Sequence, residues 1–408
     1  MSTEIAADRA ATHSTRERDW AHAALALGGF AIGTTEFATM SFLPAFTAEL
    51  GVDAPAGGHV VSAYALGVIV GAPLLAVLGA RMARRQLLML LLTWFALGNL
   101  LSAVAPSFAS LVGLRFLTAI PHGAYFGIAT LVAANMAAPG QQGRAISRVL
   151  MGLALATVVG VPLANLLAYR FGWRVGFAVV GLFSLLVVAL IRRFVPAQAP
   201  DTGTSALREL SALRRPQVWL SLGIAAVGFG GLFAVYTYLA STLRDVTGTP
   251  DSAVPAILAV FGLGIACGNA AAPRLARWGV TPAIGGLLVW SALALAIYPF
   301  CVTNPWAIGF SVFAIGCGGG LGTLLQMRLM RVAGDAQNLA ASLNHAAFNT
   351  ANALGPWLAG LALAAHWGWS STGWVGCALA VGGIVVWIVA ALTERPPQTA
   401  EATPKLAN

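Results

Sequence analysis

The chain has 408 residues, of which 58% are hydrophobic and only 9% are charged, and its formal net charge is +9. Soluble proteins carry about 25% charged residues, so this chain cannot cover a water-exposed surface, and we expect lipid to surround it. Excess arginine on short loops is an orientation signal in membrane proteins, and we therefore infer no nucleic-acid partner from the positive charge.

The apolar stretches of the chain are long enough to cross a membrane. A bilayer-spanning helix needs about 20 apolar residues, and the sequence offers twelve such stretches, separated mostly by short polar loops. We therefore predict an all-α membrane protein with twelve transmembrane helices. The predicted spans are 20–43, 57–79, 87–104, 110–134, 146–169, 175–194, 217–240, 253–273, 283–302, 306–327, 338–364 and 372–392.

Loops rich in basic residues alternate along the chain with loops that have few, and successive loops lie on opposite sides of the membrane. With both termini in the cytoplasm, 19 of the 23 Lys and Arg residues fall on the cytoplasmic side. Only Arg170, Arg174 and Arg244 fall on the opposite side, and Arg115 lies within the membrane. This asymmetry predicts a multi-pass protein of the cell (inner) membrane with an even number of spans and both termini cytoplasmic.

A polar loop at the midpoint divides the twelve spans into two groups of six. This loop contains several prolines and arginines. We predict two pseudo-symmetric six-helix bundles joined by a cytoplasmic linker. The predicted boundaries are a cytoplasmic tail at 1–19, an N-terminal bundle at 20–194, the linker at 195–216, a C-terminal bundle at 217–392 and a cytoplasmic tail at 393–408.

The two halves also share a sequence pattern. In the fifth span Ser147 is followed by Gly160, and in the eleventh span Ser342 is followed by Gly355 at the same offset. Internal repeats in a helical membrane protein are typical of transporters, which bind their substrate near the bilayer midplane between the repeats.

Glu36 is the only acidic residue inside any predicted span. A charge at the bilayer centre costs about 3 kcal/mol on insertion scales and therefore indicates a functional site. Helix geometry places Glu36 roughly 10 Å, and Arg115 roughly 8 Å, from the outer ends of their spans. If these spans are neighbours, the two side chains can pair, and a changing environment would let the carboxyl group load and release a proton. A fixed ion pair, or a carboxyl group bonded to backbone, is the alternative.

The fourth span carries three polar residues on one face. Arg115, Thr118 and His122 are spaced at i, i+3 and i+7, which places them in a row along the helix. Histidine titrates near neutral pH, so His122 is a candidate proton relay or substrate contact. A neutral histidine bonded to a neighbouring helix is the alternative.

The fifth and eleventh spans contain small residues and prolines in their interiors. Gly152, Gly160 and Pro162 lie in the fifth span, and Gly355 and Pro356 lie in the eleventh. Small residues allow close helix contact, and proline bends a transmembrane helix. We interpret these positions as hinges, with ordinary tight packing as the alternative.

A polar stripe runs along the eleventh span. His345, Asn349 and Asn352 are spaced at i, i+4 and i+7, and such a stripe should face a cavity rather than lipid. Amides both donate and accept hydrogen bonds, which suits a neutral polar solute, whereas hydrogen bonds between helices are the alternative. Further candidates for the cavity wall are Thr35, Tyr64, Thr118, Tyr236, Asn269, Gln326 and Asn344.

The sequence lacks the common motifs of enzymes and ATP-driven pumps. It contains no GxxxxGK[ST] phosphate loop, HExxH zinc motif or GxSxG nucleophile motif, and its four cysteines match no metal-site spacing. We therefore expect no enzymatic activity, cofactor or metal. The partners we expect are a small-molecule substrate, protons and the lipid bilayer, and we expect a monomer.

Several local motifs resemble those of one transporter family. These are the GTTEF segment around Glu36, the GAPLLA segment from Gly71, the Arg115 to His122-Gly123 pattern, and the GVPLAN segment from Gly160 followed by Gly172-Trp173-Arg174. They resemble the twelve-span drug:proton antiporter family of the major facilitator superfamily, in particular its sugar, purine-nucleoside and chloramphenicol efflux branch. The resemblance covers about 20–395. It implies the major facilitator fold, alternating access between two six-helix bundles, and a sealing or hinge role for the GVPLA segment.

One loop departs from the family pattern. Between the second and third spans the family resembles G-x-L-a-D-r-x-G-r-r, but this chain has Ala80 at the acidic position and Ala83 at the second glycine. Arg81, Arg84 and Arg85 are present, and the resemblance implies a cytoplasmic gate there. The charge relay that the family makes through the aspartate lacks its acid in this chain.

These observations predict a secondary active transporter that exports a drug, a sugar or a nucleoside-like molecule in exchange for protons. Glu36, Arg115 and His122 would carry the proton coupling. A facilitator or a proton-symport uptake carrier for a small polar solute is the alternative, and a channel is a further alternative.

Overall fold

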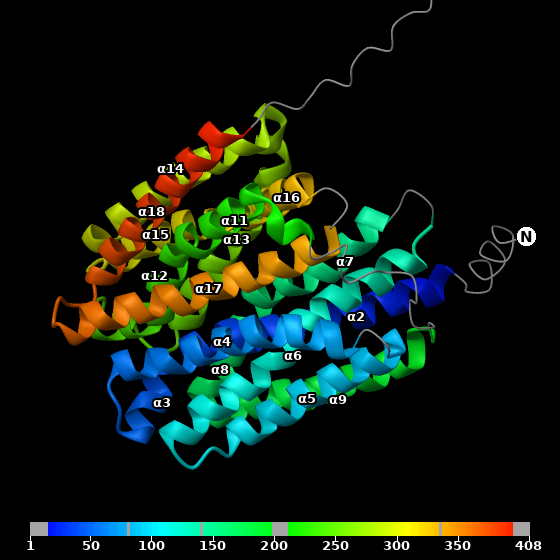
Figure 1. Ribbon diagram of the computed structural model, residues 1–408. Coiled ribbons are helices and arrows are strands. Elements are labelled where there is room, and N and C mark those ends of the chain that lie inside the picture. Colours follow the sequence, from blue (N-terminus) through cyan, green and yellow to red (C-terminus); the bar gives the residue numbers. More distant parts are fainter. Residues whose placement is uncertain (1–14, 80–81, 139–141, 198–210, 334–336, 395–408) are drawn as a thin grey trace, which may run out of the picture.

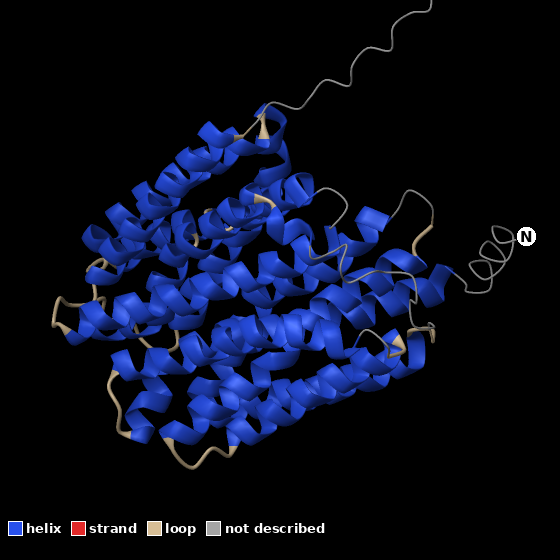
Figure 2. Cartoon of the chain, in the orientation of Figure 1, coloured by secondary structure: helices blue, strands red, loops and turns tan. Residues whose placement is uncertain are grey.

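The computed structural model describes residues 15–79, 82–138, 142–197, 211–333 and 337–394. The regular structure of these ranges is helical and includes no strand (Figure 2). Most of the helices are long and extend across the molecule (Figure 1). Large apolar side chains cover their outer faces, and Phe300, Trp306 and Phe310 are 75%, 80% and 76% exposed. Such a surface is compatible with lipid rather than water.

Eleven helices within these ranges are long and apolar enough to cross a membrane. The first begins at Thr15, earlier than predicted, and a separate short helix, α3 (Leu43–Leu50), follows it. Eight crossings are continuous: α2 (Thr15–Ser41), α4 (Ala54–Gly79), α5 (Arg84–Ala103), α6 (Phe108–Met136), α9 (Trp173–Phe194), α13 (Val254–Leu275), α14 (Val280–Cys301) and α18 (Ser371–Thr393).

The remaining three crossings contain a break in the α-helix. The fifth consists of α7 (Gln142–Leu155), a π-helical turn (Ala156–Gly160) and α8 (Val161–Phe171). The seventh consists of α11 (Pro216–Gly223), a π-helical turn (Ile224–Gly228) and α12 (Gly230–Asp245), and the tenth of α15 (Pro305–Cys317) and α16 (Gly320–Ala333).

Helix α17 (Gln337–Ala364) provides the one remaining predicted crossing, which is the eleventh in chain order. Its 28 residues are enough to span a bilayer. It is absent from the apolar candidates because the polar stripe predicted from the sequence lowers its mean hydropathy. The fold therefore agrees with the twelve predicted spans, and the crossing that is missing from the apolar candidates is the one that carries the polar stripe.

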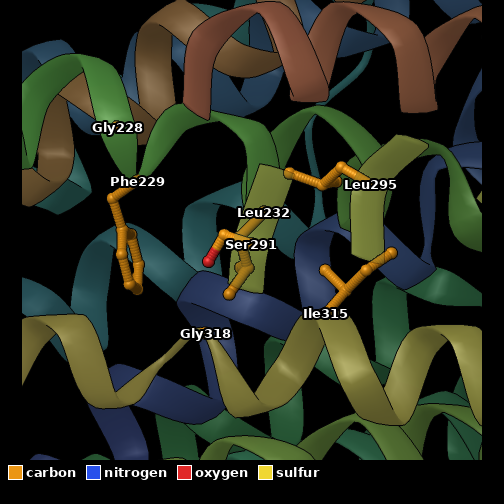
Figure 3. A pocket seen from close by; sticks show the side chains of 7 residues that line it. All are labelled: Gly228, Phe229, Leu232, Ser291, Leu295, Ile315 and Gly318. Carbon is orange, nitrogen blue, oxygen red and sulfur yellow. The ribbon is translucent and has the colours of Figure 1, made fainter. Parts of the chain in front are cut away.

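The breaks in the crossings have local causes. Proline has no N–H group, and its ring clashes with the carbonyl group four residues earlier, so the fifth crossing widens into the π-helical turn directly before Pro162. The breaks of the seventh and tenth crossings lie beside each other. Gly228, Phe229 and Gly318 line a small pocket there together with Ser291 (Figure 3).

The helices pair in the same way in each half. In the first half α4 packs on α6, α5 on α9, and α2 on α7, whereas in the second half α13 packs on α15, α14 on α18, and α12 on α17. These are the second with the fourth, the third with the sixth, and the first with the fifth helix of each half. The chain therefore forms two pseudo-symmetric six-helix bundles.

The two halves meet along two seams. Helix α17 packs along α4 (Figure 1), and α13 packs against the π-helical turn of the fifth crossing and against α8. The helices of the second seam approach closely at Gly262, because a Cβ atom there would lie 2.4 Å from the Thr157 carbonyl oxygen.

The opposite ends of the bundle differ in their cores. We call the end at which α2 begins and α18 finishes the terminal end, and the other end the distal end. At the distal end one apolar cluster joins both halves. Within it, Phe37 of α2 in the first half packs against Phe233 and Tyr236 of α12 in the second half. At the terminal end each half has an apolar cluster of its own. The halves are therefore held together mainly at the distal end.

Candidate functional site

Glu36 lies in the interior of the bundle, where α2 faces both halves. Its side chain is 8% exposed. One carboxylate oxygen, Oε1, accepts a hydrogen bond from Nδ2 of Asn352 on α17 at 3.2 Å. The other, Oε2, lies 4.0 Å from Nε2 of His122 on α6. The carboxylate predicted from the sequence therefore contacts the polar face of the fourth span in its own half and the polar stripe of the eleventh span in the other half.

Arg115 is fully buried near Glu36 but does not form the expected ion pair with it. Its Nη1 donates to Oδ1 of Asn99 at 3.2 Å, and its guanidinium group stacks 4.3 Å from the ring centroid of Tyr64 and 5.1 Å from that of Phe177. Its Nε and Nη2 atoms have no hydrogen-bond partner. The aromatic faces compensate part of the desolvation of the charge.

His122 links the two charged side chains through Tyr64. The Tyr64 hydroxyl group and Nδ1 of His122 are 3.0 Å apart, which is hydrogen-bond distance. The His122 ring also lies 5.4 Å from Phe126, and Phe126 stacks on His345 of α17 with ring centroids 5.4 Å apart. Groups from α2, α4, α6 and α17 therefore form one connected cluster, which we call the central cluster.

A fifth helix, α5, adds Asn99 to the central cluster, and this residue was not predicted from the sequence. Asn99 of α5 is fully buried, and its Oδ1 accepts hydrogen bonds from Thr35 of α2 and Arg115 of α6. Its Nδ2 donates to the Phe95 carbonyl group at 2.8 Å, which fixes the orientation of the amide. Asn99 carries an amide inside a mostly apolar span, and this feature of the sequence could have identified it as a candidate site residue.

The polar stripe of α17 divides between two environments. Asn352 reaches Glu36 and His345 reaches Phe126, whereas Asn349 donates to the His345 carbonyl group at 3.0 Å. Asn344 donates to Oε1 of Gln326 on α16 at 2.5 Å. Asn344, Asn349 and Asn352 all leave a buried side-chain oxygen without a partner, so the stripe presents hydrogen-bond acceptors inside the bundle.

The other predicted wall residues lie in separate places. Thr118 donates to the Leu114 carbonyl group within its own helix. Tyr236 stacks on Phe261 with centroids 4.2 Å apart, within the apolar cluster of the distal end. Asn269 accepts a hydrogen bond from Thr323 and packs in the second half. These three residues have no direct contact with Glu36 among the interactions of the described residues.

The predicted hinge glycines are sites of very close helix contact. A Cβ atom at Gly152 would lie 2.0 Å from the Ala26 carbonyl oxygen, and one at Gly160 would lie 2.1 Å from Oγ1 of Thr34. In the second half, a Cβ atom at Gly355 would lie 2.2 Å from the Gly230 carbonyl oxygen. Both sets therefore pack the fifth helix of a half against its first helix.

The predicted prolines and gate arginines occupy different levels of the bundle. The Pro356 carbonyl group accepts a hydrogen bond from Tyr238 at 3.0 Å, and Pro162 follows the π-helical turn. At the terminal end Arg85 donates to the Val195 carbonyl group at 3.3 Å, and Arg84 begins α5. Arg81 and Ala80 lie outside the described residues.

Arg328 lies inside a helix and not in a loop. The predicted tenth span ends before this residue, which was therefore counted as a loop charge, but α16 continues to Ala333 and Arg328 is 1% exposed. Its guanidinium group donates to Oγ of Ser221 at 3.1 Å, to Oε1 of Gln217 at 2.7 Å, to Oε2 of Glu394 at 3.0 Å, and to Thr281. Arg328 therefore joins four elements of the second half.

Glu394 completes this network just beyond the end of α18. Burial acts to raise the pKa of its carboxyl group, but hydrogen bonds from Arg328 and Thr281 and the positive charges of Arg328 and Arg331 outweigh burial. The pKa of Glu394 is therefore below its usual value. Glu394 is ionised at neutral pH and holds the end of α18 to α16.

Comparison with known proteins assigns this arrangement to a family. The family model described as Major Facilitator Superfamily matches residues 25–344. The chain belongs to the major facilitator superfamily. It is 37% identical to the inner membrane transport protein YdhP of Escherichia coli (strain K12), over 92% of this chain and 96% of that protein.

Two further comparisons agree with the membership in the superfamily. The chain is 34% identical to the chloramphenicol resistance protein of Streptomyces lividans, over 83% of this chain and 88% of that protein. The solved structure of a bacterial homologue of the human lysosomal transporter Spinster superposes with a TM-score of 0.70 at 18% identity, covering 93% of this chain and 96% of that one. The protein is therefore an integral membrane transporter of small molecules, as the sequence resemblance predicted.

Proposed function

We propose that this transporter exports a small organic molecule in exchange for protons, by alternating access between its two halves. Glu36 would carry the proton, and His122 and Arg115 would adjust the affinity of its carboxyl group for the proton. The stripe of α17 would line the substrate path. The observation that carries the proposal is the contact of one buried carboxylate with His122 in its own half and with Asn352 in the other.

The proton role of Glu36 rests on its chemistry and position. It is the only carboxylate inside a predicted span, and a carboxylate at that depth is costly unless it serves a function. A neutral carboxyl group retains an acceptor oxygen, so protonation weakens the hydrogen bond from Asn352 without removing any member of the central cluster.

The substrate and direction of transport are part of the proposal. The chloramphenicol resistance protein, 34% identical to this chain, supports a small organic substrate. The acceptor atoms of α17 favour a molecule that carries hydrogen-bond donors. The excess of basic residues supports a cytoplasmic terminal end, so the structure would correspond to a carrier closed toward the outside, and we propose that it works as a monomer with the domain boundaries given above.

Transport by the purified protein in proteoliposomes tests the proposal. The vesicles contain a pH-sensitive dye and receive an imposed pH gradient, and chloramphenicol, arabinose and inosine are added one at a time. Proton movement that depends on one of these compounds would identify the substrate class. We expect Glu36→Gln to abolish this movement, because glutamine keeps the size of the side chain but cannot bind or release the proton.

The matched control is Asp19→Asn on the same helix. Asp19 is 58% exposed and pairs with Arg148 at 2.8 Å, so this change should leave transport unaltered. Undiminished substrate-driven proton exchange by Glu36→Gln would refute the proton role of Glu36. Net accumulation of substrate along the proton gradient, rather than against it, would favour the uptake symporter, and passive equilibration without proton movement would favour the facilitator.

A further inference from the structure

We propose that the hydrogen bond from Asn352 to Glu36 is the lock that stops the empty carrier from changing state. This inference rests on the proposed function. An exchanger must change state when it carries substrate or proton, but not when it carries neither, since an empty carrier that reorients lets protons leak. The lock must therefore join the two halves only while Glu36 is ionised and no substrate is bound.

The Asn352–Glu36 hydrogen bond has the required position. It joins α17 of the second half to α2 of the first half, and both side chains are buried. The same hydrogen-bond distance occurs inside a half between Arg115 and Asn99, but that contact cannot oppose relative motion of the halves. Asn352 thus touches the proton site from the opposite bundle.

The orientation of the Asn352 amide is set by its partner. A carboxylate accepts hydrogen bonds and does not donate them, so the amide nitrogen of Asn352 must face Glu36. The amide oxygen then points elsewhere, and it is buried without a donor. A substrate N–H or O–H group that binds this oxygen would draw the amide away from Glu36, so substrate has a direct route to open the lock.

Protonation provides the second route to open the lock. Hydrogen bonds to a charged group are stronger than those between neutral groups, so neutralising Glu36 weakens the link between the halves. The other titratable or charged groups around Glu36 are His122 and Arg115 on α6, Tyr64 on α4 and His345 on α17. His122, Arg115 and Tyr64 belong to the first half. His345 of the second half stacks on Phe126 and has no hydrogen bond or ion pair with Glu36 in the part of the chain that the structure describes.

Proton leak in the absence of any substrate tests the lock. Dye-loaded proteoliposomes receive a pH gradient, with valinomycin and potassium to clamp the voltage. We expect Asn352→Ala to raise the leak at least about tenfold, which corresponds to losing a hydrogen bond to a charged group. Asn352→Leu, which is similar in size and has no donor, should leak equally and serves if the alanine variant folds poorly.

Two further variants separate the possible causes of a leak. Asn165→Ala removes another buried amide, which donates to the Ser41 carbonyl group within the first half at 3.4 Å, and it should not leak. Adding Glu36→Gln to Asn352→Ala should abolish the leak, because the proton carrier is gone.

The outcomes distinguish this inference from the proposed function. Wild-type leak rates in both Asn352 variants, with Glu36→Gln still abolishing substrate-driven proton exchange, would overturn the lock and leave the proposed function standing. A leak that persists in the double variant would show that protons do not pass through Glu36, and both would fall.

Discussion

Among the described residues, each half of the protein buries one arginine, and the two are held in opposite ways. Arg328 in the second half donates to four side chains, one of which is the carboxylate of Glu394. Arg115 in the first half donates to the single amide oxygen of Asn99 and has two nitrogen atoms without a hydrogen-bond partner. Both are no more than 1% exposed.

The difference separates a structural charge from one available for function. A buried charge is tolerated when its partners are complete, and Arg328 meets this condition, so it has nothing left to offer a ligand or a proton. Arg115 stacks on aromatic rings instead and keeps free donors beside the Glu36 site. We infer that the Arg328 network stabilises the second half, whereas Arg115 contributes to the electrostatics of the proposed proton site.

Removal of Arg328 should have the largest effect on stability. Arg328→Gln leaves Glu394 and three polar side chains without their donor, and we expect a loss of about 3 kcal/mol, because each buried polar group left without a partner costs about 1 kcal/mol. Thermal unfolding in detergent measures this loss. Arg274→Gln, at an exposed arginine of α13, is the control and should unfold like the wild type. An unchanged unfolding temperature for Arg328→Gln would refute the structural role.

Removal of Arg115 should cost less stability and more activity. Arg115→Gln deletes one hydrogen bond and two unpartnered donors, so we expect a change of only about 1 kcal/mol. Substrate-driven proton exchange should fall at least about tenfold, because the positive charge next to the proton site is lost. A loss of stability as large as that of Arg328→Gln would remove the contrast between the two arginines.

The smallest expected effect is a change in how stability depends on pH. The pKa of Glu394 is lowered in the folded protein, so its ionised form contributes stability above the unfolded-state pKa, and this contribution disappears as the pH falls through the folded-state pKa. We expect Glu394→Gln to lower stability by about 0.5 kcal/mol at pH 7. The difference from wild type should vanish in acid, and a constant difference from pH 7 to pH 3 would contradict the ionic role.

The ionisable residues of the central cluster were predicted from the sequence, but Asn99 and several of the contacts were not. Glu36 and His122 were selected because ionisable groups are costly in a membrane, and the structure brings them together. A direct ion pair between Glu36 and Arg115, which the sequence suggested, is not among the contacts of the described residues, because helix depth constrains position along the membrane normal but not which side chains face each other. Tyr64 and Asn99 take the contacts of Arg115, and only the packing of α4 and α5 against α6 brings them there.

Local patterns determined the helices, their number and the division into halves, because bilayer thickness and loop polarity act on each segment separately. Tertiary structure decided which buried polar groups became partners. Arg328 was read as a loop charge because only the packing of α11, α14 and α18 around α16 surrounds it with acceptors. The Asn352–Glu36 contact, which joins residues 316 positions apart, likewise depends on how two bundles meet, and no local spacing encodes that.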